Sequence, residues 1–311
     1  MEFPQEFFLD EVRDGFFVPA MMKRVWAAEL EILIEIDKIC DRHHIRYFID
    51  YGTLLGAMRH KGFIPWDDDM DVDMLRPDYE RFCQVVDQFI DHERFFFQNT
   101  DTDTGYRWVF GKMRRKNTEY IRVGQTHLRQ QTGLCIDVFP LDEAQGEGFG
   151  QWLRFRAASL CRKFLWSPVG ARHASSAMAR YFFWLLSKVP RDWVLACYRR
   201  IVIGSRQYTD GARLVSYNAD DVLDKPYERS WFEKTVDLAF EGHLFPAPQG
   251  YDEVLTLSYG DYMRLPPPAE QKGVADAFAI RFSDGETLCG DDGCFAGGGS
   301  APGGGHTGMK E

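Results

Sequence analysis

The sequence lacks the excess of positive charge that is typical of proteins that bind nucleic acids. It has 37 lysines and arginines against 47 aspartates and glutamates, which gives a formal net charge of −10 at pH 7. Contacts to the phosphates of DNA or RNA need a basic surface, so this balance argues against a general nucleic-acid-binding protein. We therefore expect no nucleic acid among its partners.

Long apolar runs are also missing. No run reaches the roughly 18 uninterrupted apolar residues that a membrane-spanning helix needs. The opening residues, MEFPQEFFLDEVRDG, carry acids where a secretory signal peptide has a basic region followed by an apolar one. From these two observations we expect a cytoplasmic protein.

The cysteines do not follow the pattern of a small disulfide-stabilised protein either, because their number is odd. The seven cysteines lie mostly within apolar stretches, which favours buried thiols in a reducing compartment. Of the 311 residues, 45% are hydrophobic, 15% aromatic and 27% charged, which is typical of a globular protein. The chain is long enough for one catalytic-sized core and an additional segment.

The hydrophobic pattern indicates helices mixed with a few short strands. Apolar residues at helical spacing predict a helix over residues 21–43, a short one over residues 54–59 and another that begins at Pro77 and Asp78. Alternation or short apolar runs predict strands at residues 47–49, 69–74, 95–98, 106–114 and 134–139. We expect an α+β fold with a small mixed β-sheet flanked by helices.

Residues 151–208 differ in composition from the rest of the chain. They hold eleven lysines and arginines and a single acid, Asp192, so this segment has a charge of +10 and the remainder −20. We expect a helical insert, broken by Pro168 and Pro190 into pieces too short to span a bilayer. Its basic and aromatic side chains suit a membrane interface, so peripheral membrane contact is one hypothesis. The alternative is an ordinary helical subdomain with a solvated basic face.

The main candidate site lies in the predicted strand over residues 69–74. Asp69, Asp71 and Asp73 share one face of this strand, which we expect to be wet, while Met70, Val72 and Met74 point into a core. Carboxylates packed so closely either take up protons or hold cations, and divalent metal ions are the usual solution. A solvated acidic strand is one alternative. A calcium-binding EF-hand loop is another, but it would need glycine where Met74 stands.

A glycine turn precedes this strand. Gly52 and Thr53 stand at a predicted helix start, where free backbone N–H groups and the helix dipole favour a phosphate group. Arg59, His60 and Lys61 follow and are candidate phosphate contacts; alternatively they are the solvated basic end of that helix.

Several segments together resemble the LicD family of phosphotransferases, which includes the fukutin-related proteins and belongs to the nucleotidyltransferase-fold superfamily. The matching segments, in order, are RYFIDYGTLLGAMRHKGFIPWDDDMDV from Arg46, RPDYERF from Arg76, GLCIDVFPLD from Gly133, FEG from Phe240 and YGDYMRLPPP from Tyr259. The resemblance implies a nucleotidyltransferase-like core. Departures from the family pattern are Asp73, the segment ADAF at residues 275–278 and the glycine-rich end of the chain.

The resemblance also implies roles for individual residues. Asp69 and Asp71 would be a metal-binding pair, and Asp137, which lies in the predicted strand over residues 134–139, the third carboxylate; these three are the expected catalytic and metal-binding residues. Mg²⁺ or Mn²⁺ would be the cofactor. Gly52 and Thr53 would bind a nucleotide phosphate, and Lys112 would neutralise phosphate, with a surface position as the alternative. A capped or salt-bridged structural aspartate is the alternative for Asp137.

The activity implied by the resemblance is transfer of a phospho-alcohol, such as phosphocholine or a polyol phosphate, from a CDP-linked donor to a glycan hydroxyl, with release of CMP. The acceptor would be a lipopolysaccharide or cell-surface polysaccharide, built on a lipid carrier at the inner face of the membrane. Two alternatives remain open: a nucleotidyltransferase with the same carboxylates, which would release pyrophosphate, and a non-catalytic glycan-binding module.

Five parts of the chain are expected. They are a lead over residues 1–20, the catalytic core over 21–145, the basic aromatic helical insert over 146–210, the C-terminal part of the LicD-like domain over 211–285 and a glycine-rich disordered tail over 286–311.

Overall fold

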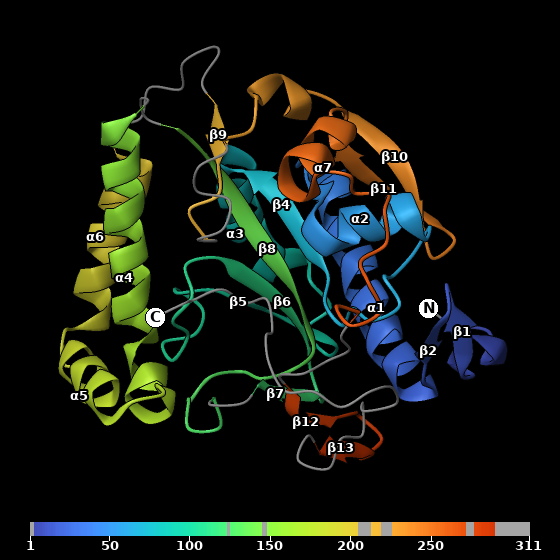
Figure 1. Ribbon diagram of the computed structural model, residues 1–311, viewed down its shortest axis with the longest axis horizontal. Coiled ribbons are helices and arrows are strands. Elements are labelled where there is room, and N and C mark those ends of the chain that lie inside the picture. The colour runs from blue at the N-terminus through green and yellow to red at the C-terminus, as the bar shows by residue number, and fades with distance from the viewer. Residues whose placement is uncertain are drawn as a thin grey trace.

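A mixed β-sheet forms the centre of the molecule. The computed structural model describes residues 3–122, 125–144, 148–204, 213–218, 226–271 and 277–289. The strand order in the sheet is β3-β4-β8-β6-β5, and β9 pairs with β8 (Figure 1). Strands β4 and β8 are parallel and the other neighbours are antiparallel. The strands span Phe48–Ile49 (β3), Asp71–Leu75 (β4), Phe95–Gln98 (β5), Gly111–Arg115 (β6), Cys135–Glu143 (β8) and Leu214–Val215 (β9).

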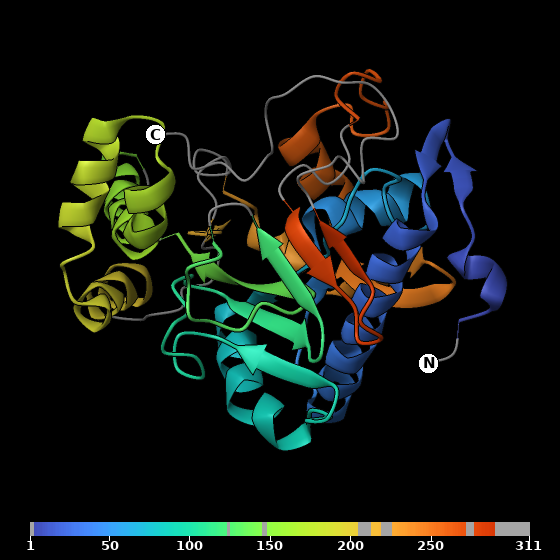
Figure 2. The same cartoon turned by 90° about the horizontal axis from the view of Figure 1, so that it is seen from below.

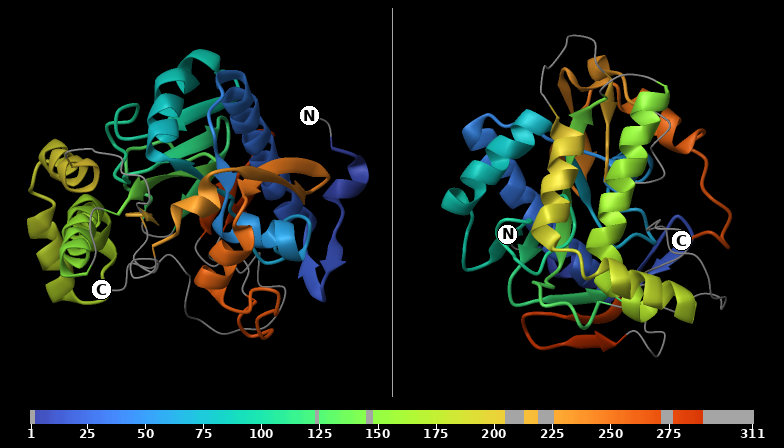
Figure 3. Two further views of the ribbon diagram at one scale, coloured as in Figure 1. Left: turned by 90° about the horizontal axis from the view of Figure 1, so that it is seen from above. Right: turned by 90° about the vertical axis from the view of Figure 1, so that its left-hand side faces the viewer.

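Two helices cover the apolar face of this sheet, as Figures 2 and 3 show. Helix α1 (Ala20–His43) packs on β6 and β8, and α3 (Arg76–Phe89) packs on β4, β5 and β8. Phe82 of α3 meets Phe97 of β5 edge to face, with ring centroids 5.3 Å apart. The strand residues on this face are buried: Val72, Met74, Phe97, Met113, Ile136 and Val138. The predicted α+β fold with a small mixed sheet and flanking helices is confirmed.

The remaining elements pack around the opposite side and the edges. Helix α2 (Tyr51–Arg59) contacts β4, β10 and α7 (Tyr251–Tyr259). The hairpin of β10 (Thr235–Phe240) and β11 (His243–Pro248) packs on β3. A second sheet has the order β13-β12-β7, and β1 pairs with β2 near the N-terminus. These strands span Glu11–Arg13 (β1), Phe16–Val18 (β2), Glu119–Arg122 (β7), Ala277–Arg281 (β12) and Thr287–Cys289 (β13), and two short 3₁₀ helices span Gln5–Phe8 and Arg229–Phe232.

The strand predicted over residues 69–74 needs a correction. Strand β4 begins at Asp71, so Asp69 lies in the loop before it. The expectation of one wet acidic face is wrong, because Asp73 is fully buried in its pairing with Phe48 of β3 and Phe139 of β8. The alternation of acidic and apolar residues correctly predicts a strand, but the strands on both sides of β4 shield Asp73 from solvent. The EF-hand alternative also fails, since β4 and the start of α3 occupy the region of the would-be loop.

The basic aromatic segment forms three helices at one side of the molecule (Figures 1 and 3). They are α4 (Phe149–His173), α5 (Ala177–Leu186) and α6 (Arg191–Ile203). Pro190 separates α5 from α6 as expected, but the predicted break at Pro168 is wrong because Pro168 lies inside α4. Proline removes the N–H that would bind the carbonyl of Phe164, and the Ser167 hydroxyl donates to that carbonyl instead, at 2.6 Å.

None of the helices in the described ranges combines the length and the apolarity needed to cross a membrane. The glycine-rich end from residue 290 and the first two residues of the segment at 275–278 lie outside the described residues. Strand β13 reaches four residues past the expected domain boundary at 285, because it pairs with β12.

Candidate functional site

Strand pairing brings a row of polar side chains together on the open face of the central sheet. Asp71 of β4 is paired with Asp137 of β8, and Asp137 is paired with Lys112 of β6. Paired residues on neighbouring strands point to the same face, about 4.8 Å apart along the sheet. The Lys112 ammonium forms an ion pair with a carboxylate oxygen of Asp137. Two predicted carboxylates and one predicted phosphate contact therefore meet because three strands adopt this register.

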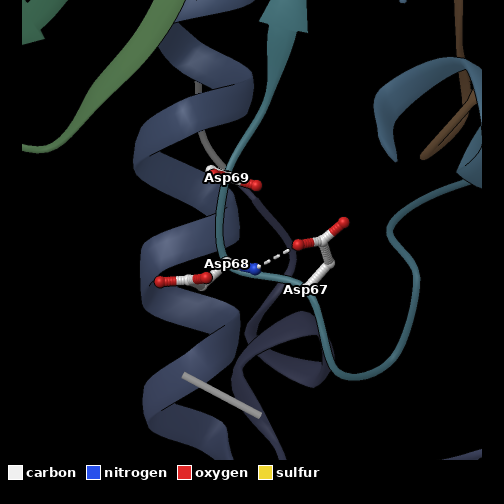
Figure 4. Close-up of side chains that lie close together, drawn as sticks. All are labelled: Asp67, Asp68 and Asp69. Atoms are coloured by element: carbon white, nitrogen blue, oxygen red, sulfur yellow. Dashed lines mark hydrogen bonds between the residues drawn. The ribbon is translucent and has the colours of Figure 1, made fainter. Parts of the chain in front are cut away.

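The loop before β4 adds three consecutive carboxylates, shown in Figure 4. Within the part of the chain that the structure describes, Asp67, Asp68 and Asp69 form the one group of metal-ligand type whose ligand atoms all lie within 4.8 Å of one another. Asp67 accepts a hydrogen bond from the backbone N–H of Asp68 at 3.2 Å. The loop is tied to α1, because the Trp26 indole donates to the Asp67 carbonyl at 2.8 Å. Asp69 thus belongs to both the predicted metal pair and this cluster.

Neighbouring carboxylates of the row and the loop raise the pKa of Asp71 and of Asp67. For Asp71, burial raises the pKa well above its ordinary value, neighbouring Asp69, Asp137 and Asp67 raise it further, and Lys112 opposes them. Burial and the charges of Asp69 and Asp68 likewise raise the pKa of Asp67. Such crowding of buried acids is the arrangement that a bound cation relieves. The structure brings Asp69, Asp71 and Asp137 into one electrostatically coupled group.

Two residues of β7 that the sequence analysis did not single out also reach this group. A guanidinium nitrogen of Arg122 lies 3.6 Å from a carboxylate oxygen of Asp69, and the Tyr120 hydroxyl donates to Asp68. The pKa of Arg122 is raised: burial lowers it, but Tyr120, Asp69 and Asp68 outweigh that effect. Strand β7 is held by its pairing with β12 and by the bond from the Tyr120 N–H to the Thr132 carbonyl, and no spacing in the sequence signals these contacts.

Glu29 of α1 is a further acid near the loop that the sequence analysis missed. Its side chain is 2% exposed, and one of its carboxylate oxygens has no hydrogen-bond partner among the described residues. Burial raises the pKa of Glu29 well above its ordinary value, and the charges of Asp69 and Asp68 add to this. A glutamate on the buried face of a helix breaks the apolar pattern, which is the one sequence signal that could have identified it.

The start of α2 faces the same group. Asp50 caps the helix and accepts from the backbone N–H of Tyr51 at 2.8 Å. Tyr51 has a φ of +48°, a left-handed conformation that is strained for a bulky residue. A Cβ atom at Gly52 would lie 2.5 Å from a carboxylate oxygen of Asp67, so glycine lets this carboxylate approach the helix start without shifting. The Thr53 hydroxyl accepts from the backbone N–H of Asp71 at 2.8 Å, which joins the helix start to β4.

Asp50 also faces Asp73 in the interior. Both side chains are buried, at 2% and 0% exposure. Burial and the Asp50 carboxylate raise the pKa of Asp73 well above its ordinary value. Burial raises the pKa of Asp50 too, although its contacts to Asp73 and to the Tyr51 N–H oppose the change. The two carboxylates lie where the start of α2 meets β4, and the backbone N–H of Asp50 donates to the Asp71 carbonyl at 3.2 Å.

The other predicted phosphate contacts have protein partners elsewhere. The Arg59 guanidinium donates to the carbonyls of Tyr262 and Arg264, which links α2 to the segment after α7. The His60 side chain is 1% exposed and its Nδ1 contacts Asp14. Lys61 is exposed, and its carbonyl accepts from the backbone N–H of Glu241 at 2.8 Å. Among the four predicted basic residues, Lys112 is the one that contacts a carboxylate of the predicted metal set.

Known proteins include relatives of this chain. Residues 44–179 match the family model described as LicD/FKTN/FKRP, nucleotidyltransferase domain. The chain is 32% identical over 253 residues to the lipopolysaccharide cholinephosphotransferase LicD of Haemophilus influenzae, covering 78% of this chain and 91% of that protein. An uncharacterized protein of Rickettsia typhi is 39% identical over 59 residues, which are 19% of each chain. One of Rickettsia prowazekii is 37% identical over 59 residues.

Proposed function

Because the chain belongs to the LicD family, we propose that it transfers phosphocholine, or a chemically similar phospho-alcohol, to a hydroxyl group of a lipopolysaccharide or related cell-surface glycan. It is a phosphotransferase enzyme. We propose further that the donor is a CDP-linked alcohol and that the second product is CMP. The observation that carries this proposal is the row of Asp71, Asp137 and Lys112, with Asp69 beside it.

The donor atoms of this row fit a divalent cation. Asp69, Asp71 and Asp137 offer only carboxylate oxygens, which are the ligands that Mg²⁺ and Mn²⁺ prefer. The charges of Asp69 and Asp137 raise the pKa of Asp71, which supports the fit, because closely spaced carboxylates are electrostatically unfavourable without a cation. When bound, the ion supplies positive charge that neutralises the pyrophosphate of the donor.

The chain's own residues perform the remaining work in this proposal. The Lys112 ammonium and the Arg122 guanidinium add positive charge opposite the phosphates. The N-terminal turn of α2, with Gly52 and Thr53, offers free backbone N–H groups to a phosphate. One of the carboxylates, Asp71 or Asp137, accepts the proton of the attacking hydroxyl. The hydroxyl oxygen bonds to the β-phosphorus as the bond from that phosphorus to the bridging oxygen breaks, and CMP departs.

We also propose that the acceptor glycan is carried on a lipid, so that the enzyme meets it at the inner face of the membrane. In this proposal the enzyme accelerates the transfer by positioning the reactants and stabilising charge, and the protein forms no covalent intermediate.

The test is an assay of product release. The full chain is incubated with Mg²⁺, lipopolysaccharide that lacks phosphocholine, and in turn CDP-choline, CDP-ribitol and CDP-glycerol. We expect CMP release with one donor and incorporation of its alcohol phosphate into the glycan. Omission of acceptor and the Asp71→Asn variant are the controls. Pyrophosphate release from CTP and an alcohol phosphate, without transfer to glycan, would instead identify a nucleotidyltransferase. If no donor gives CMP or incorporation, the proposal is wrong.

A further inference from the structure

Helix α5 (Ala177–Leu186) turns an apolar face to solvent. Met178, Tyr181, Phe182 and Leu185 fall at the spacing i, i+3, i+4 and i+7, which places them on one face of the helix. Their exposed fractions are 82%, 62%, 54% and 46%. In a globular protein such a face normally lies against the core. We call these four residues the α5 face.

The orientation of α5 is fixed by its other side. Phe183 packs on the ring of Trp166 of α4 edge to face, with ring centroids 5.3 Å apart. A Cβ atom at Gly170 would lie 2.6 Å from the Phe183 ring, so glycine allows this close packing. Ser176 caps the helix by accepting from the N–H of Ala179 at 3.1 Å. The α5 face therefore points outward because the opposite side already holds the contact with α4.

The segment that carries the α5 face is strongly basic. Residues 151–204 contain ten lysines and arginines and one acid, Asp192, which forms an ion pair with Arg191. Arg172 precedes α5 and Lys188 follows it; both are exposed, and the Lys188 ammonium lies 4.6 Å from the centre of the Trp184 ring. An apolar helix face with interfacial aromatic rings and basic flanks complements an anionic lipid surface.

We propose that the α5 face inserts into the interfacial region of an anionic phospholipid bilayer, with the exposed basic side chains that flank α5, Arg172 and Lys188, on the lipid headgroups. A second copy of the chain is a poorer occupant, because pairing two α5 faces would bring two positively charged segments together. This inference rests on the exposed helix and not on the proposed chemistry. It goes beyond the proposed function by naming the surface that holds the enzyme at a membrane.

The test is co-flotation of the full chain with vesicles. One set contains about one third phosphatidylglycerol in phosphatidylcholine and the other is phosphatidylcholine alone, at low and physiological salt. We expect binding to the anionic vesicles that weakens as salt rises. The double variant Phe182→Glu/Leu185→Glu should bind at least tenfold more weakly. The variant Arg172→Glu/Lys188→Glu should bind more weakly by about fivefold or more for each residue changed.

A matched control makes the same apolar-to-acid changes away from the insert. Leu9 and Leu244 are 63% and 67% exposed, and Leu9→Glu/Leu244→Glu adds the same negative charge to the chain. We expect this control to bind vesicles as the unchanged protein does. Thermal unfolding confirms that each variant folds. The proposal is wrong if the unchanged chain stays unbound at low salt, if the α5 variant and the control lose binding equally, or if the α5 variant instead abolishes a dimer in solution.

Discussion

Asp71 and Asp69 differ from isolated acids because other carboxylates lie close to them, among them Asp137. Changing either to asparagine keeps the shape of the side chain and removes its charge. We expect turnover to fall by about 10²- to 10³-fold or more, because positive charge can no longer be held at the phosphates. The free energy of unfolding should stay equal or rise slightly for Asp71→Asn, since a buried carboxylate with a raised pKa is removed.

The measurement is CMP release together with thermal unfolding of each variant. Asp87→Asn on the exposed side of α3 is the control, and it should leave both unchanged. Normal turnover in Asp71→Asn would remove this residue from the site.

His60 gives a pH-dependent prediction. Burial lowers the pKa of its imidazole, and the contact with Asp14 only partly opposes this. The unfolded chain therefore binds a proton at this residue below about pH 6.5, where the folded chain resists it. The contribution of His60 to the free energy of unfolding should fall as the pH drops below that value and stay constant above it, whereas buried acids with a raised pKa, such as Asp73, contribute in the opposite direction.

Urea unfolding of the protein at pH 5, 6, 7 and 8 measures this dependence. His60→Gln should flatten the part of the curve between pH 5 and 7. The same slope in both proteins would show that His60 does not contribute.

At the residue scale, the sequence identified the acids of the site better than its cations. Asp71 and Asp137 each interrupt an apolar run, and an acid in a strand core needs a local reason. Arg59, His60 and Lys61 cluster in sequence, but α2 ends among them and sends their side chains to separate partners. Arg122 lies near Asp69 because of where β7 packs, which depends on contacts with the distant strand β12 and other segments.

At the element scale, Arg76 joins the start of α3 to β8. Its guanidinium binds both carboxylate oxygens of Asp142 at 2.7 Å, and both side chains are buried. Removing one partner of a buried ion pair typically costs about 3–5 kcal/mol, because the other charge is left in the interior. We expect Arg76→Met to lower the free energy of unfolding by this amount.

The double variant Arg76→Met/Asp142→Leu should recover most of the loss, because it leaves neither charge of the pair in the interior. Denaturant unfolding of the two single variants and the double variant measures the coupling. Additive losses would show that the two side chains act independently.

Local sequence patterns predict which helices and strands form more accurately than they predict the residues at which these begin and end. The strand predicted over residues 95–98 matches β5, and the helix predicted from residue 21 matches α1 within one residue. The expected helix break at Pro168 does not occur. The Ser167 hydroxyl donates to the Phe164 carbonyl in place of the N–H that proline lacks, and this depends on the rotamer of one side chain. The burial of Asp73 depends on strands on both sides of β4, which its own alternation cannot reveal.

At the scale of the whole molecule, opposite charges are separated between two parts of the chain. The insert over residues 151–208 carries +10 and the rest −20, and the described part of the insert forms a separate group of helices beside the sheet (Figure 1). The sequence gives this asymmetry directly. It cannot show which apolar side chains of the insert face solvent, because that depends on how α5 packs on α4.

From the carboxylates at the site we also predict how divalent ions change the thermal stability of the whole molecule. A ligand that binds only the folded state stabilises it, by about 2.7 kcal/mol at a concentration 100 times its dissociation constant. For a chain of this size we expect Mn²⁺ to raise the melting temperature by several degrees, at about 2–4 °C for each kcal/mol. Sodium chloride at the same ionic strength should have a much smaller effect.

The double variant Asp69→Asn/Asp71→Asn should lose the response to Mn²⁺, whereas Asp87→Asn should keep it. An equal shift in all three proteins would place the ion elsewhere, and no shift in the unchanged protein would contradict a cation site at these carboxylates.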